Sequence, residues 1–186
     1  FHRLGSNEVV NYSFVSPSMN SLSNSDQDMI DLQNPISIEM SVMRNSLWPG
    51  LLNNLSHNIK RQNKNIKIFE IGKLFASKNK KPIEKNVIAG LIYGQRRLES
   101  WAYQKNSLDF YDLKGHLEDL FNSFELKNIT FVSTSHPMLC PGVAAEIKLK
   151  NKKIGIIGML NPELATDMKL DHDAFIFEID YSNLEL

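Results

Sequence analysis

Cysteine is nearly absent from the sequence, since Cys140 is the only one among 186 residues. A single thiol cannot form an intramolecular disulfide and cannot build a metal site that needs four cysteines. A disulfide within the chain and a four-cysteine metal site are therefore both excluded. A chain without disulfides suits a reducing compartment, and we expect it to be cytoplasmic.

Long hydrophobic runs are also missing. One of the longest, residues 154–160, is far shorter than the roughly 20 apolar residues that cross a bilayer as a helix. Residues 1–5 have neither an initiator Met nor the basic start, apolar stretch and cleavage site of a signal peptide. We therefore expect no membrane contact, and we expect the chain to be part of a longer protein.

Charge of one sign is not in excess, because 21 basic and 21 acidic side chains balance to a formal net charge of zero. No global field then attracts the chain to nucleic acid or to an anionic membrane. Any contact with RNA would have to be local. The content of 42% hydrophobic and 23% charged residues is enough for a real core, so we expect one large or two small globular domains.

Segments rich in beta-branched and aromatic residues predict strands. The most regular segment, 36–42, alternates apolar and polar residues as a half-buried strand does. Its inward-facing residues would be Ile36, Ile38, Met40 and Val42. Segments 144–149 and 153–159 are joined by a few residues around Asn151, which requires an antiparallel hairpin. Further strands are predicted at 9–15, 66–75, 87–93, 129–132 and 175–179.

Three segments show the helical spacing of apolar residues. The first follows a potential cap at Asn45 and Ser46, has Pro49 in its first turn and ends near residue 62. The second would pack through Leu113, Leu117, Leu120, Phe121 and Phe124. The third begins with Asn161 as its cap, followed by Pro162 and Glu163. Polar segments 16–34 and 77–86 are predicted as surface loops. The fold class is therefore α+β, a large and mostly antiparallel sheet flanked by helices.

Four blocks, which together cover nearly the whole chain, resemble the synthetase-like module of the bacterial phenylalanyl-tRNA synthetase beta subunit. The first is EVVNYSFV at 8–15. The second joins MRNSLWPGLL at 43–52, Asn58 and IFEIGKLF at 68–75. The third is DFYDLKG at 109–115, and the last runs from Pro141 to Glu163. The resemblance implies a class II aminoacyl-tRNA synthetase-like fold. Residues 1–186 would form a single module, with two subregions, 1–76 and 87–186, joined by a polar loop as the alternative.

Two positions depart from the family pattern. Cys140 and Asn161 stand where the family usually has the histidines of a His-Pro-Gly and a His-Pro-Glu motif. Cysteine can fill the volume of a small apolar residue, and asparagine can cap a helix. We therefore expect a structural role at both positions.

The arginines that would hold the phosphates of a nucleotide are missing. Class II synthetases neutralise the triphosphate with one arginine after a strand and another in a late glycine-rich segment. Here Ala76 and Ser77 follow the predicted strand, and no arginine occurs after Arg97. The resemblance likewise implies that catalysis belongs to the alpha subunit. We expect no catalytic or cofactor-binding residue in this chain, whereas the whole enzyme would use ATP and magnesium.

Three other patterns that could carry chemistry lack the features that their chemistry requires. The five histidines have no metal-ligand spacing, so no metal site is assigned: they are His2, His57, His116, His136 and His172. A nucleophile–base pair of Cys140 with His136 lacks a nearby acid to orient the base. Gly155 and Gly158 lie inside a predicted strand and cannot cradle phosphate as a loop before a helix does.

The resemblance implies a heterotetramer of two alpha and two beta subunits, in which this module also meets other beta-subunit domains. An obligate interface is apolar at its centre. The candidate interface residues are Leu47, Trp48, Leu51, Leu55, Trp101 and Tyr103. Packing in the core is the alternative for those on the predicted helix.

A second hypothesis is direct binding of tRNA-Phe through a local basic patch that follows the phosphates. Its candidate residues are Lys60, Arg61, Lys64, Lys67, Lys78, Lys80 and Lys81. Solvated lysines with no ligand are the alternative interpretation, and the lack of interleaved aromatic residues argues against base readout. An independent enzyme of unknown type is a third hypothesis.

Overall fold

The computed structural model describes residues 5–23, 29–78, 81–96 and 106–182. Three of the predicted site residues, Lys80, Trp101 and Tyr103, lie outside these ranges, and so does the side chain of Lys78.

A seven-stranded sheet forms the centre of the fold, with the strand order β1-β4-β5-β9-β8-β7-β6. All neighbouring strands are antiparallel except β1, which runs parallel to β4. The large, mostly antiparallel sheet is therefore confirmed, and so is the hairpin around Asn151. The strands are β1 (Asn7–Glu8), β4 (Ile66–Lys78), β5 (Lys81–Tyr93), β6 (Ile129–Ser133), β7 (Leu139–Leu149), β8 (Lys152–Leu160) and β9 (Ala174–Asp180).

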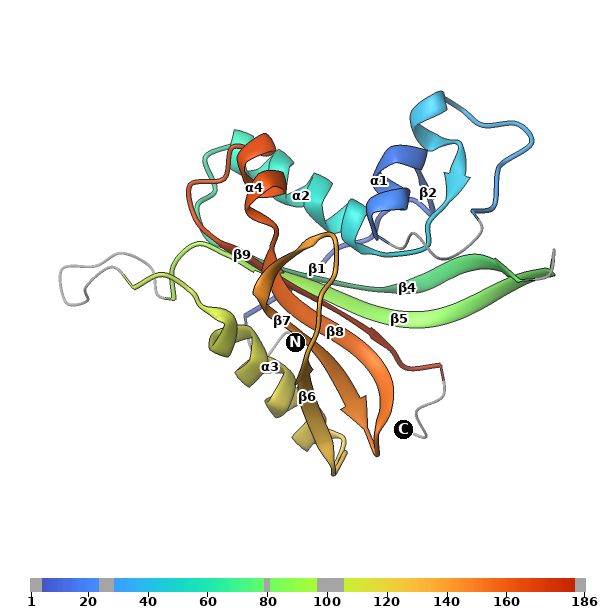
Figure 1. Ribbon diagram of the computed structural model, residues 1–186. Coiled ribbons are helices and arrows are strands. Elements are labelled where there is room, and N and C mark those ends of the chain that lie inside the picture. The colour runs from blue at the N-terminus through green and yellow to red at the C-terminus, as the bar shows by residue number, and fades with distance from the viewer. Residues whose placement is uncertain (1–4, 24–28, 79–80, 97–105, 183–186) are drawn as a thin grey trace.

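Strands β4 and β5 pair over their whole length, from Ile66 with Tyr93 to Lys78 with Lys81. Strand β9 pairs with β5 only at residues 87–93, so the end of the hairpin extends beyond the sheet as a two-stranded ribbon (Figure 1). The prediction of a loop at 77–86 is wrong, because polar side chains on a ribbon face solvent while the two strands satisfy each other's backbone groups.

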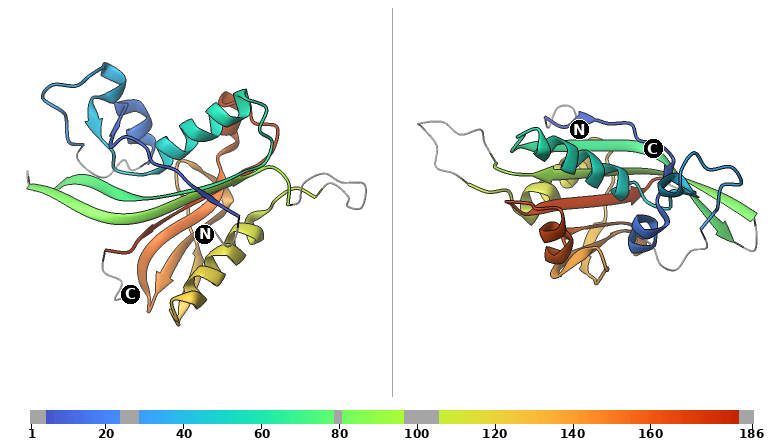
Figure 2. Two further views of the ribbon diagram at one scale, coloured as in Figure 1. Left: turned by 180° about the vertical axis from the view of Figure 1, so that it is seen from behind. Right: turned by 90° about the horizontal axis from the view of Figure 1, so that it is seen from above.

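Four helices were found in the described ranges: α1 (Pro17–Ser23), α2 (Trp48–Lys60), α3 (Phe110–Ser123) and α4 (Pro162–Asp167). Figures 1 and 2 show α1, α2 and α4 on one face of the sheet and α3 on the other. The three predicted helices are confirmed. Helix α1 lies inside the predicted loop 16–34, where the Ser16 hydroxyl accepts a hydrogen bond from Met19 N and Pro17 occupies the first helical position. No helix in the described part of the chain is long and apolar enough to span a membrane.

Each face of the sheet has its own apolar core, since alternate residues of a strand point to opposite faces. The core beneath α2 includes Leu51, Leu55, Leu91 and Ile176. The core beneath α3 includes Leu113, Leu117, Phe121 and Phe177. The predicted apolar stripes of both helices therefore pack on the sheet, except that Phe124, just past the end of α3, is half exposed.

The two N-terminal strand predictions are mostly wrong. Within 36–42, residues Ile38–Met40 form a short 3-10 helix, and only β3 (Val42–Met43) is a strand. Ile36 and Ile38 are 84% and 85% exposed. Within 9–15, only β2 (Phe14–Val15) is a strand, and it pairs with β3. Alternation alone does not make a strand, because an extended segment also needs a neighbouring strand along its whole length.

Candidate functional site

A buried ion pair joins the segment before α2 to strand β4. Arg44 Nη1 lies 2.6 Å from Glu70 Oε1, and the two side chains are 7% and 2% exposed. Arg44 Nε donates to Lys73 O at 3.0 Å, and Asn11 Nδ2 donates to Glu70 Oε2 at 2.7 Å. Buried charges persist only when they are paired and hydrogen-bonded in this way. The network thus fixes the start of α2 against the sheet.

Two glycines make room for this network. A Cβ at Gly72 would lie 2.4 Å from Arg44 Nη2, and a Cβ at Gly50 would lie 2.9 Å from the side chain of Asn11. Asn54 Nδ2 also donates to Asn11 Oδ1 at 3.0 Å. The first two sequence blocks therefore meet in one structural unit, and close internal packing is the use of both glycines.

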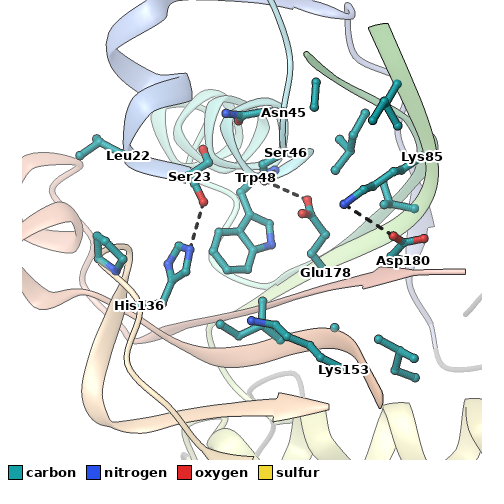
Figure 3. A pocket seen from close by; sticks show the side chains of 18 of the residues that line it. Leu22, Ser23, Asn45, Ser46, Trp48, Lys85, His136, Lys153, Glu178 and Asp180 are labelled. Atoms are coloured by element: carbon teal, nitrogen blue, oxygen red, sulfur yellow. Dashed lines mark hydrogen bonds and ion pairs between the residues drawn. The ribbon is translucent and has the colours of Figure 1, made fainter. Parts of the chain in front are cut away.

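A cavity of about 470 Å³ opens beside this network on the α2 face of the sheet (Figure 3). Its walls come from the C-terminal end of α1, the start of α2, the segment before β7, and strands β4, β5, β8 and β9. Its polar and charged lining includes Ser46, Lys85, His136, Lys153, Glu178 and Asp180.

Glu178 anchors the start of α2 to strand β9. Its Oε2 accepts hydrogen bonds from Ser46 Oγ at 2.8 Å and from Leu47 N at 2.7 Å. The amide of Leu47 belongs to the helix start, where the helix dipole also favours negative charge. Burial raises the pKa of Glu178 to about 7, although both hydrogen bonds act in the opposite direction. The carboxyl group of Glu178 therefore has a structural role, which is to hold the start of α2 on the sheet.

Trp48 and His136 form another part of the wall. Trp48 Nε1 donates to Phe177 O at 3.0 Å, and the His136 ring lies edge-on to the indole at a centroid distance of 5.1 Å. His136 Nδ1 accepts from Met138 N at 3.2 Å, so Nε2 carries the proton and donates to Ser23 O at 3.0 Å. Burial lowers the pKa of His136. The ring therefore ties α1 to the segment before β7 as a neutral imidazole.

The two lysines of the cavity face carboxylates. Lys85 Nζ lies 3.9 Å from Asp180 Oδ2, and Lys153 Nζ lies 2.8 Å from Glu146 Oε1. Each ammonium group therefore already has a carboxylate beside it and is not a free ligand for phosphate.

No arginine in the described part of the chain lines the cavity. Arg44 is buried with Glu70, Arg61 follows the end of α2, and Arg96 binds the carboxylates of Asp109 and Asp112. A triphosphate calls for guanidinium groups, whereas Glu178 and Asp180 would repel it. The cavity residues therefore do not fit ATP.

Within the described ranges, no group of three or more His, Cys, Asp or Glu residues converges, so these residues offer no cluster of metal ligands. Four histidines lie on separate parts of the fold, and His2 lies outside the described residues. The Cys140 Sγ lies 3.6 Å from its neighbour Pro141 O, while His136 is engaged with Ser23 and Met138.

Asn161 caps α4. Its Oδ1 accepts a hydrogen bond from Glu163 N at 2.9 Å, and its Nδ2 donates to Pro137 O at 3.2 Å. The expected structural role of this residue is therefore confirmed.

Four predicted interface residues are buried in the core of this chain: Leu47, Trp48, Leu51 and Leu55. The expectation that they form an exposed patch is wrong, and the alternative of core packing is confirmed for them. The apolar stripe of α2 faces the sheet of its own chain, so none of it is left for a partner.

Those of the predicted basic residues that the structure describes do not form one patch. Lys60, Arg61 and Lys64 are exposed near the end of α2. Lys67 lies close enough to His116 of α3 to affect its pKa, which places this lysine toward the other face of the sheet. Lys81 lies at the far end of β4 and β5, and thirteen residues of strand span roughly 40 Å. The sequence places these residues close together, but an extended hairpin separates them.

Exposed apolar residues lie instead beside the edge strand β1. Val10 and Tyr12 are 90% and 72% exposed, while the alternate residues Val9 and Asn11 pack inward. The sequence analysis predicted residues 9–15 as one strand and missed this surface. The available signal was the presence of large apolar residues on both faces of that segment.

Comparison with known proteins places the chain in one family. The family described as "Phenylalanyl tRNA synthetase beta chain CLM domain" matches residues 1–181. The phenylalanine-tRNA ligase beta subunit of Legionella pneumophila (strain Paris) is 38% identical over 184 residues, which are 99% of this chain and 23% of that protein. The same subunit of Pseudomonas putida is 39% identical over 176 residues, or 94% of this chain and 22% of that protein. The chain thus spans about a quarter of the length of these relatives.

The fold is similar to that of a solved synthetase. The pyrrolysyl tRNA synthetase of Desulfitobacterium hafniense superimposes with a TM-score of 0.69 at 14% identity, over 96% of this chain and 61% of that chain. At this identity the likeness concerns the fold alone, and it agrees with the expected class II synthetase-like architecture. Together with the match over residues 1–181, it leads to one conclusion: the chain belongs to the phenylalanyl-tRNA synthetase beta chain family and forms its synthetase-like domain.

Proposed function

We propose that this chain is a non-catalytic, synthetase-like module that supports assembly with the catalytic alpha subunit for ATP-dependent charging of tRNA-Phe. The observation that carries the proposal is the cavity on the sheet, whose described lining contains carboxylates and paired lysines but no arginine. A class II-like cavity whose described lining has no guanidinium group cannot neutralise a triphosphate in the usual way. A heterotetramer in the cytoplasm is part of the same proposal.

The edge of the sheet at β1 supports assembly. This strand is only two residues long, and Val10 and Tyr12 follow it with most of their surface exposed. Edge strands present unpaired backbone groups, and exposed aromatic and apolar side chains are enriched where partners bind. We therefore propose this edge as a contact with the alpha subunit.

Co-purification with the alpha subunit tests the assembly. The chain is expected to co-purify, and Val10→Asp or Tyr12→Asp is expected to weaken the complex at least roughly tenfold, because each places a charge or loses an aromatic contact in the interface. Val132→Asp is the matched control, since Val132 is also exposed but lies on β6 at the opposite edge of the sheet. Equal binding by all three variants would contradict the proposed contact.

Pyrophosphate exchange tests the non-catalytic character. The chain alone is expected to show no exchange between ATP and pyrophosphate in the presence of phenylalanine, while the assembled enzyme is active. Robust activity of the chain by itself would overturn the proposal.

A further inference from the structure

Among the charged side chains that line the cavity, Glu178 alone has no ion-pair partner within the described part of the chain. Lys85 Nζ lies 3.9 Å from Asp180 Oδ2, and Lys153 Nζ lies 2.8 Å from Glu146 Oε1. Glu178 accepts its hydrogen bonds from neutral groups instead. A partly buried carboxylate without a counter-charge is unfavourable, so a positive group placed beside it is stabilised.

The two oxygens of the Glu178 carboxyl group have different surroundings. Oε2 accepts hydrogen bonds from Ser46 Oγ at 2.8 Å and from Leu47 N at 2.7 Å, whereas no described residue donates a hydrogen bond to Oε1. Figure 3 shows Glu178 in the cavity, with Trp48 on one side and Lys85 on the other. Oε1 therefore keeps its acceptor capacity for a donor from outside the chain.

The rest of the lining indicates the kind of molecule that would carry this donor. Small-molecule sites combine apolar walls with a few polar groups, and the cavity of about 470 Å³ has this composition. An anionic head group is not favoured, because both lysines already have carboxylates beside them. The lining thus fits an apolar body with a positively charged head. The apolar walls include Trp48, Leu74, Ile83, Val87 and Ile156.

We propose that the cavity binds a small primary amine, with its ammonium group on Glu178 Oε1 and its apolar body against Trp48 and Ile156. An ammonium group has three donors and supplies the counter-charge that Glu178 lacks, and a hydrogen bond between two charged groups is stronger than one between neutral groups. Oε2 keeps its hydrogen bonds to the start of α2. This site goes beyond the proposed function, because it does not require the alpha subunit.

The ionisation of Glu178 gives the site a pH signature. Burial raises its pKa to about 7, and only the ionised carboxylate attracts an ammonium group. About a tenth of the carboxyl groups are ionised at pH 6 and about nine-tenths at pH 8, so the apparent affinity is expected to rise roughly tenfold over this range. A primary alkylamine stays protonated throughout, as a lysine side chain does. The other charged or titratable side chains around Glu178 are Arg44, Lys85, His136, Lys153 and Asp180.

Titration of the chain with pentylamine tests the site. The backbone amide of Leu47 is the reporter in NMR spectra, because it donates to the same carboxyl group. At pH 8 we expect a Kd of about 1 mM, which is the order expected for a ligand of this size. Pentan-1-ol has the same apolar body but no charge, so it is expected to bind at least roughly tenfold more weakly.

Glu178→Gln separates the contribution of Glu178 from those of its neighbours. Its amide oxygen can still accept the hydrogen bonds from Ser46 and Leu47, but it offers no negative charge. We expect pentylamine to bind this variant at least roughly tenfold more weakly and without the rise between pH 6 and pH 8. Glu84→Gln is the matched control, since it removes a carboxylate from the exposed ribbon and is expected to leave binding within about twofold.

The outcomes decide the proposal without reference to assembly. Loss of pentylamine binding in Glu178→Gln together with retention in Glu84→Gln supports the site. No shift of the Leu47 amide signal, equal binding of pentan-1-ol, or equal binding by Glu178→Gln would each overturn it. A fall in affinity from pH 6 to pH 8 in the unmodified chain would overturn it as well, and this measurement does not depend on the folding of a variant.

Discussion

The two faces of the sheet are held by different kinds of contact. On the α2 face, directional polar contacts run through the packing: the buried pair of Arg44 and Glu70, and Glu178 bound to the start of α2. On the α3 face, the core cluster consists of apolar side chains such as Leu117 and Phe121. The first face is specified by hydrogen-bond geometry and the second by volume and shape, so the two should respond differently to substitution, pH and salt.

Removal of one partner of the buried pair is expected to have the largest effect. Glu70→Ala leaves the Arg44 guanidinium buried without its carboxylate, and we expect a loss of about 3–5 kcal/mol in the free energy of unfolding, measured with urea. Glu84→Ala is the control, because Glu84 pairs with Lys73 on the exposed ribbon and its loss should change little. Similar losses in both variants would show that the buried network does not specify the α2 face.

Truncation of an apolar side chain tests the other face. Leu117 is fully buried on α3, and Leu117→Ala is expected to cost about 2–5 kcal/mol of unfolding free energy through lost burial and the resulting cavity. Because no charge is involved, the loss should be the same at low and high salt and at pH 5 and pH 8. A loss that changes markedly with pH would mean that this face also depends on ionised groups.

The pH dependence of Glu178 should be smaller but distinctive. Burial raises its pKa from 4.5 to about 7 in the folded chain, so the folded state holds the proton more tightly than the unfolded state does. Its contribution to stability is therefore fully present below pH 4.5 and is lost as the pH rises through about 7. We expect a loss of roughly 1–3 kcal/mol between pH 4.5 and 8.

Glu178→Gln isolates this contribution, since the amide oxygen can still accept the hydrogen bonds from Ser46 and Leu47 but does not ionise. Urea unfolding of both proteins across this pH range gives the difference. Histidines such as His136 titrate in both proteins and cancel in the comparison. Parallel curves for the variant and the unmodified chain would contradict the raised pKa.

Much of the sheet was predictable because its strands carry their own signals. Segments 66–75, 87–93, 144–149 and 153–159 all lie within observed strands, and the short link at Asn151 left one way to pair two of them. The α2, α3 and α4 helices were predictable from apolar spacing and from caps such as Asn161. These signals are local, so no knowledge of the rest of the fold was needed.

The candidate site was less predictable. The absence of arginine after Arg97 can be read directly from the sequence, but the cavity is assembled from strands that are far apart in the chain. Contacts such as Glu178 with Leu47 join residues separated by more than half the chain length. Neither this contact nor the exposure of Val10 and Tyr12 follows from any local pattern.

The sequence by itself determined the fold class, the main strands and helices, the family resemblance and the shortage of arginine, because each depends on residue identity or on local periodicity. Tertiary structure decided which apolar residues are core and which are surface. Leu51 and Leu55 are buried because the sheet lies beneath α2, whereas Ile36 and Ile38 are exposed because no strand pairs with their segment over its length. Burial depends on the neighbours that the whole chain brings together, and periodicity alone does not reveal them.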